Sequence, residues 1–347
     1  MKKSKIAAVL GASALLLTAC AGGGSADSGS STGGGGGEAA ATSDLRFVNV
    51  VKLLGVGWFD RMEEGIVAFA SETGIDATQT GADDASPEKQ VRLVEDLIAQ
   101  GVDAITVVPN SPEALEGVFQ RAREAGIIIV THEAASQRNT DADIEAFDNT
   151  AYGETIMANL AECMGGEGEY AAFVGQVTAE SHMQWVAGAY EYAKANFPGI
   201  TRVEDPLESR ENADVAYDQT KELLLKYPNL KGIQGSSAVD VVGIGRAVEE
   251  LGLSDSVCVM GTSIPSLAGQ FLETGAIDKI FFWDPALAGQ AMMMIAQMLV
   301  NGEELTNGTN LGLVGYESLQ QSPDNPTTWF GSAWVIVDKD NADQYPF

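Results

Sequence analysis

Residues 101–131, GVDAITVVPNSPEALEGVFQRAREAGIIIVT, contain the unit that decides the fold. The apolar runs 104–108 and 127–131 have the length and the β-branched content of buried strands. Between them, 112–125 has apolar residues at helical spacing, and Gly126 follows where a helix would end. A strand, a helix and a second strand in this order predict a βαβ unit within a parallel sheet.

The same alternation extends in both directions along the chain. Before this unit we expect strands at 45–53 and 75–80 and helices at 60–73 and 87–100, the last closed by Gly101. A second series begins near Thr150, with strands at 170–174, 201–204, 232–234, 257–260 and 279–282 and helices at 181–196, 214–227, 239–251, 265–273 and 286–300. Two such sets predict two doubly wound α/β lobes, and a single (β/α)₈ barrel remains the alternative.

Charge and composition exclude several classes of function. The 347 residues carry 20 Lys and Arg against 49 Asp and Glu, a net charge of −29, which repels nucleic acids and anionic membranes. The only histidines are His132 and His182, and no Cys-x-x-Cys spacing exists, so we expect no zinc site. No motif in the chain calls for a nucleotide, a metal or another cofactor.

The N-terminus predicts export and a lipid anchor. Lys2, Lys3 and Lys5 precede an apolar run over 6–17, and Leu17-Thr18-Ala19-Cys20 resembles the cleavage box of bacterial lipoproteins. We therefore expect a signal peptide over 1–19 and a lipidated Cys20, with an ordinary export signal as the alternative. Residues 20–43 continue as a Gly/Ser-rich flexible tether, so the protein would contact the membrane only through its lipid, outside the cytoplasm.

Two further cysteines, Cys163 and Cys258, lie in a chain bound for a compartment that permits disulfides. They are able to pair, but Cys258 stands in the apolar run Val257–Met260, which favours a buried, unpaired side chain.

Polar and aromatic side chains follow many of the predicted strands. Ligands of parallel α/β sheets bind outside the carboxyl ends of the strands, so these side chains would meet at one site. Hydroxyl groups need charged or amide partners, and the C–H faces of sugars stack on aromatic rings. The stretches in question are Lys52 with 55–59, His132-Glu133, 181–185, Ser236-Ser237, Thr262-Ser263 and Trp283-Asp284. Their composition suits a sugar or a polyol.

At these residues the chain resembles a known family. The run KLLGVGWF at 52–59, the stretch 101–112, Gln184-Trp185-Val186, GTSIP at 261–265 and Trp283-Asp284 are similar to type I periplasmic sugar-binding proteins of ABC importers. The autoinducer-2-, rhamnose- and ribose-binding members are the nearest in pattern. The resemblance implies two lobes joined by a three-strand hinge: 44–148 with 285–313, and 149–284 with 314–347. It also implies a monomer that closes on its ligand and docks on a membrane permease served by an ATPase.

The family's ligand contacts are only partly kept. Relative to the autoinducer-2 pattern, Lys52 and Ala238 are retained, whereas Glu133, the pair Ser181-His182 and Ser236 differ. We therefore expect a different small sugar or polyol, of the pentose, deoxyhexose or tetritol class. The expected ligand-binding residues are Lys52, Trp58, Phe59, Glu133, Ser181, His182, Trp185, Ser236, Ala238, Ser263, Trp283 and Asp284.

Three other functions remain as alternatives at this stage. An autoinducer-2 receptor would have the same fold, and a sensory module would present the same closed lobes to a membrane receptor. An exported glycosidase would use two carboxylates such as Glu133 and Asp284 as its acid and base. Resemblance over nearly the whole mature chain favours binding without chemistry.

Overall fold

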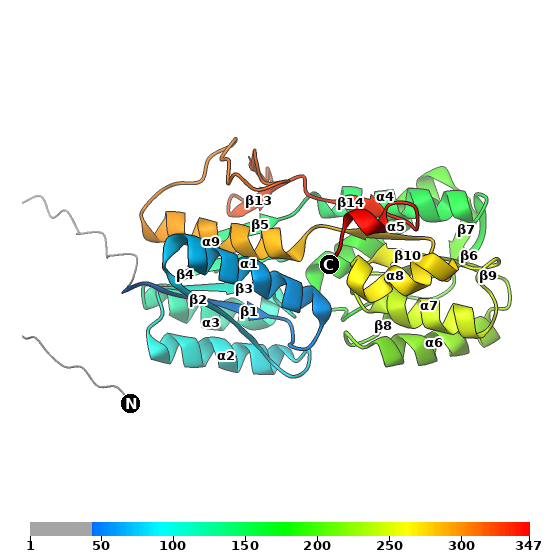
Figure 1. Cartoon of the computed structure of the whole chain (residues 1–347), viewed down its shortest axis with the longest axis horizontal. Helices are drawn as coiled ribbons and strands as arrows, with labels where there is room; N and C mark the ends of the chain where they lie inside the picture. Colours follow the sequence, from blue (N-terminus) through cyan, green and yellow to red (C-terminus); the bar gives the residue numbers. More distant parts are fainter. Residues whose placement is uncertain (1–43) are drawn as a thin grey trace, which may run out of the picture. The chain divides into compact units, whose positions relative to one another are not determined.

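The computed structural model describes residues 44–347. The predicted signal peptide, the lipidated Cys20 and the tether lie outside the described residues. Within them, the chain forms two separate sheets, each covered by helices on both faces (Figure 1). The prediction of two doubly wound α/β lobes is therefore confirmed, and the single barrel is wrong.

The first sheet has the strand order β12-β13-β5-β4-β3-β1-β2 and is parallel except at the β12–β13 edge. Helices α2 and α3 cover one face, and α1 and α9 the other (Figure 1). The unit over 101–131 forms β3, α3 and β4, with β3 and β4 paired in parallel as predicted. The elements are β1 (Arg46–Val51), α1 (Gly57–Thr73), β2 (Asp76–Gly81), α2 (Pro87–Gln100), β3 (Ala104–Val107), α3 (Pro112–Glu124), β4 (Ile128–His132), β5 (Ala142–Glu145), α9 (Pro285–Val300), β12 (Gln320–Gln321) and β13 (Thr328–Phe330).

The second sheet has the order β14-β11-β10-β9-β6-β7, with the short β8 also paired to β6. Only the edge strand β14 runs antiparallel to its neighbour. The elements are α4 (Asn149–Cys163), β6 (Glu167–Val174), α5 (Glu180–Asn196), β7 (Gly199–Arg202), β8 (Leu207–Glu208), α6 (Ala213–Lys226), β9 (Leu230–Gly235), α7 (Asp240–Glu250), β10 (Cys258–Thr262), α8 (Pro265–Thr274), β11 (Lys279–Phe282), β14 (Val335–Val337) and the 3₁₀ turn η2 (Ala342–Gln344).

Three segments connect the two sheets. They are Ala146–Asp148 after β5, Trp283–Asp284 after β11, and Gly331–Trp334 after β13. Two of them are bonded together, because Ala333 N donates to Ala146 O at 3.0 Å. The last crossing corrects one expectation: β12 and β13 belong to the first sheet, so the chain returns to the second lobe only after Phe330 and not at 314.

Local sequence signals explain most helix boundaries. Ser86 and Ser111 cap α2 and α3 by accepting a backbone N–H, and each is followed by a proline at the first helical position. Gly101 and Gly126 adopt the left-handed conformation that ends these helices, as predicted. The sequence did not single out β5 or α4. Helix α4 is buried against both α5 and β10, so its apolar residues do not form one stripe.

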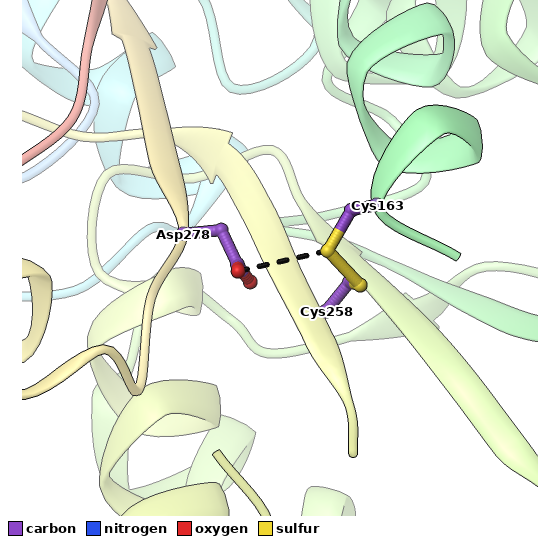
Figure 2. A group of neighbouring side chains, drawn as sticks. All are labelled: Cys163, Cys258 and Asp278. Carbon is purple, nitrogen blue, oxygen red and sulfur yellow. Dashed lines mark hydrogen bonds between the residues drawn. A yellow bond between two sulfur atoms is a disulfide. The ribbon is translucent and has the colours of Figure 1, made fainter. Parts of the chain in front are cut away.

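A disulfide joins Cys163, at the end of α4, to Cys258, at the start of β10 (Figure 2). The Cα atoms are 6.1 Å apart, within the range for this bond. The expectation of an unpaired, buried Cys258 is therefore wrong. Cys163 ends α4, a helix that was not predicted, so the sequence offered no reason to place Cys163 next to β10. Asp278 approaches the bond, with Oδ1 3.6 Å from Cys163 Sγ.

Across 44–347, no helix is long and apolar enough to cross a bilayer.

Candidate functional site

A small, nearly closed cavity lies where the carboxyl ends of strands from both sheets face each other. Its free volume is about 20 Å³, room for about one water molecule. Nine of the twelve predicted residues line it, together with Val56, Glu211, Ser237 and Thr262: these nine are Lys52, Trp58, Phe59, Glu133, His182, Trp185, Ser236, Ala238 and Trp283.

An ion pair forms the polar floor of the cavity. Lys52 Nζ, just after β1, donates to Glu133 Oε2, just after β4, at 2.7 Å, and the two side chains are 3% and 5% exposed. Ser181 Oγ donates to the same oxygen at 2.8 Å from the second sheet's α5. Burial alone would raise the pKa of Glu133, but the Lys52 charge and its hydrogen bond, together with the His132 and His182 rings, outweigh it and hold that pKa at about 2. Burial likewise opposes the charge on Lys52, yet the Glu133 and Glu211 carboxylates raise its pKa above the ordinary value.

His182 faces the ion pair from the second sheet as a neutral ring. Its Nδ1 accepts a hydrogen bond from the backbone N–H of Gly175 at 3.1 Å. Nε2 lies 3.4 Å from Lys52 Nζ. Burial, reinforced by the Lys52 charge, lowers the pKa of His182 well below its usual value.

Aromatic rings also line the cavity. Trp283 contacts Trp58 edge to face, with centroids 4.7 Å apart, and Trp185 at 5.7 Å. Trp283 Nε1–H donates to His132 Nε2 at 3.1 Å, and Trp185 Nε1–H donates to Asn149 Oδ1 at 2.7 Å. Because both indole N–H groups are already used, these rings offer their carbon surfaces to a ligand.

Three predicted residues do not line the cavity. Ser181 supports Glu133 from behind, and Ser263 Oγ donates to Ala238 O at 2.7 Å, which fixes the loop after β9. Asp284 caps α9 through Ala286 N, and its two oxygens accept from Arg61 at 3.0 and 2.7 Å. The expectation that Asp284 contacts the ligand is therefore not supported, since its carboxylate is already bonded to Arg61 of α1 and to the first turn of α9.

Buried polar side chains hold the cavity's backbone on each side. Under the first sheet, Asn110 Nδ2 donates to Lys52 O at 2.8 Å, and Gln90 Nε2 donates to Val108 O at 2.8 Å. Under the second sheet, Asp240 Oδ2 accepts from the N–H groups of Ser236 and Ser237 at 3.1 and 2.8 Å. These contacts fix the chain as it leaves β1, β3 and β9.

Four lining residues were missing from the predicted set. Val56, Ser237 and Thr262 lie in strand-end stretches that the sequence did mark, although other members were chosen there. Glu211 was missed altogether. It follows β8, a two-residue strand that pairs in parallel with β6 and is too short to be seen as a strand in the sequence. No local signal distinguishes Glu211 from the other 48 acidic residues.

Comparison with known proteins gives the same architecture. A family model described as a periplasmic binding protein domain matches residues 47–304. The chain belongs to the periplasmic binding protein family. Among curated members, the ribose import binding protein of Bacillus subtilis (strain 168) is 25% identical over 261 residues, 74% of this chain and 81% of that protein. A xylitol-binding protein of Mycolicibacterium smegmatis is 26% identical over 76% of this chain and 75% of its own length.

Solved structures of family members superpose closely on this chain. A solute-binding protein from Clostridium phytofermentas with bound L-rhamnose has a TM-score of 0.80 at 20% identity, over 87% of this chain and 98% of that one. LsrB from Clostridium saccharobutylicum in complex with AI-2 also has a TM-score of 0.80, at 17% identity, over 87% of this chain and 100% of its own. At these identities the likeness establishes the fold alone.

Proposed function

We propose that this protein works outside the cytoplasmic membrane, where it binds a small, uncharged sugar or polyol between its two sheets. It then delivers this ligand to an ABC import permease in the membrane. The single observation that carries the proposal is the composition of the cavity. Its lining combines a buried Lys52–Glu133 ion pair with aromatic rings, and the indole N–H groups of Trp185 and Trp283 are already bonded within the protein. Hydroxyl groups suit the first surface and C–H groups suit the second.

The division of the cavity between two sheets supports capture by closure. Lys52 and Glu133 come from the first sheet, whereas His182, Glu211 and Ser236 come from the second. A ligand held by one sheet makes its remaining hydrogen bonds only when the other approaches, so binding shifts the population toward the closed form. The closed form would then be the one that docks on the permease, and the lipid on Cys20 would keep it near the membrane.

The names of curated relatives support the ligand class. They include proteins that bind ribose, allose, xylose and xylitol. We propose a ligand other than autoinducer-2, because Ser181 and His182 replace the acidic and amide pair of the autoinducer-2 pattern, and because burial keeps the His182 ring neutral.

A thermal-shift screen of the purified full chain against pentoses, hexoses, deoxysugars, polyols and autoinducer-2 tests the proposal. A ligand present at 100 times its Kd should stabilise the fold by about 2.7 kcal/mol. We expect at least one sugar or polyol to raise Tm, to bind by calorimetry, and to be recovered unaltered. Conversion of that ligand into product would identify a hydrolase. If no compound in the panel raised Tm, that result would contradict the proposal.

A further inference from the structure

Glu211 enters the cavity from the loop between β8 and α6. Its side chain is only 7% exposed. It faces the same space as Lys52 and Glu133, but it comes from the opposite sheet. The cavity therefore holds two carboxylates and a single lysine.

The backbone at Glu211 is held in a costly conformation. Its φ is 56°, in the left-handed region that side chains with a Cβ rarely adopt. In residues 44–347 only Glu133, Arg210 and Glu211 do this without being glycine, so two of the three are cavity carboxylates. Such a conformation costs free energy and persists only where its surroundings enforce it, often at functional sites. Gly175 adds to this arrangement, because a Cβ there would overlap Glu211 Oε1.

The charge of Glu211 has no cation paired directly with it. Within the described part of the chain, no lysine or arginine nitrogen lies within 4.0 Å of its oxygens, and Lys52 is bonded to Glu133. Its nearest ring nitrogen, His182 Nδ1 at 4.0 Å, is itself an acceptor. The one side-chain donor to this carboxylate is Ser237 Oγ, which bonds Oε2. Oε1 therefore keeps its capacity to accept a hydrogen bond.

We infer, on the basis of the proposed function, that Glu211 sets the charge of the ligand: its Oε1 accepts a hydrogen bond from a ligand hydroxyl and its negative charge excludes sugar acids and sugar phosphates. The ion pair contributes no net charge, so the unpaired carboxylate makes the cavity negative. An anionic ligand would bury a second negative charge beside it in a site of low polarity, whereas a hydroxyl group supplies the missing donor. The ligand class is thus neutral polyhydroxy compounds.

Matched pairs of ligands test this assignment. Calorimetry on the full chain compares D-xylose with D-glucuronate, D-galactose with D-galacturonate, and xylitol with D-xylonate, so that each pair differs chiefly by a carboxylate. Measurements use the wild type, Glu211→Gln, and the control Glu222→Gln, which removes the same charge from the exposed face of α6. Glu211→Asp, which keeps the charge, is the conservative variant, and Tm values confirm that each variant folds.

We expect the wild type to bind the neutral member of at least one pair about 100-fold more tightly than the acid. The amide oxygen of Glu211→Gln still accepts from the ligand hydroxyl, but the bond loses its charge assistance, which should cost about tenfold in affinity for the neutral ligand. Its preference for neutral over acid should also fall at least about tenfold, whereas Glu222→Gln and Glu211→Asp keep that preference. An unchanged preference in Glu211→Gln would overturn this inference alone. Failure of the wild type to bind any member of the panel would overturn the proposed function, and this inference with it.

Discussion

The two halves of the cavity wall differ in how completely they are bonded without a ligand. The first-sheet half consists of Lys52, Val56, Trp58, Phe59 and Glu133, and its two charges are bonded to each other. The second-sheet half consists of His182, Trp185, Glu211, Ser236, Ser237, Ala238 and Thr262. In that half, Ser236 Oγ is buried with no hydrogen-bond partner, and the Glu211 charge is unpaired.

This difference indicates separate tasks for the halves. The first-sheet half is a preformed surface that needs nothing from the ligand to be stable. The second-sheet half keeps buried polar groups that cost free energy until partners arrive. Ligand binding should therefore stabilise the second-sheet half more, and substitutions in the two halves should separate effects on stability from effects on affinity.

Breaking the ion pair should have the largest effect. Lys52→Met leaves Glu133 buried without its cation, which we expect to lower the free energy of unfolding by about 3–5 kcal/mol in urea titrations. The double variant Lys52→Met, Glu133→Leu removes both charges, and should regain most of that stability while binding no sugar. A double variant as unstable as the single one would show that the pair does not act as a unit.

The disulfide braces only the second sheet, so its removal should weaken that lobe without altering the cavity. It closes a loop of 95 residues, and we expect Cys163→Ala with Cys258→Ala to lower the free energy of unfolding by about 2–4 kcal/mol. Cys258 lies at the opposite end of β10 from Thr262, so ligand affinity well below Tm should not change. The wild type should lose similar stability on reduction, and the variant should not respond to reductant. Weakened ligand binding in the variant would argue that the bond shapes the cavity.

Two serines contrast the halves directly. Ser181 Oγ supports the Glu133 carboxylate, so Ser181→Ala should cost about 1.5–3 kcal/mol of stability. Ser236 Oγ has no partner, so Ser236→Ala should leave the ligand-free protein unchanged or slightly more stable, yet weaken ligand binding. Urea unfolding with and without ligand measures both. Equal losses of stability from the two substitutions would remove the distinction between the halves.

The sequence could predict one half of the site better than the other, for a physical reason. Lys52 and Glu133 directly follow apolar strands, which places them at the sheet edge, and the family resemblance marked both positions as ligand contacts. Glu211 follows a two-residue strand that exists only through its pairing with β6, a tertiary contact. Asp284 was misjudged although its signal was local: an aspartate directly before Pro285 is a helix cap. The return of 320–330 to the first sheet likewise depends on pairing with β5, which no local pattern reveals.

The smallest expected difference between the two halves lies in how each contributes to the pH dependence of the free energy of unfolding. Burial raises the pKa of Asp240, which holds the Ser236–Ser237 backbone, to about 7, whereas the pKa of Glu133 is held at about 2. Between about pH 4 and 7 the folded protein keeps a proton on Asp240 that the unfolded chain has lost, so stability falls as pH rises through this window, by at most about 1.4 kcal/mol per pH unit from this group. Glu133 is ionised throughout that window once folded and adds stability that is lost only as pH falls from about 4.5 toward 2.

Asp240→Asn should therefore reduce the decline in stability between pH 5 and 7, measured by urea unfolding at each pH. The control Asp255→Asn alters an exposed carboxylate on the same lobe and should leave the decline as it is in the wild type. Subtracting the variant's curve from the wild-type curve removes the contribution of other buried acids, such as Asp143, whose pKa burial also raises. Parallel curves for Asp240→Asn and the wild type would mean that Asp240 is ionised in the fold. The Ser236–Ser237 loop would then be held by a charged group, as the first-sheet half is.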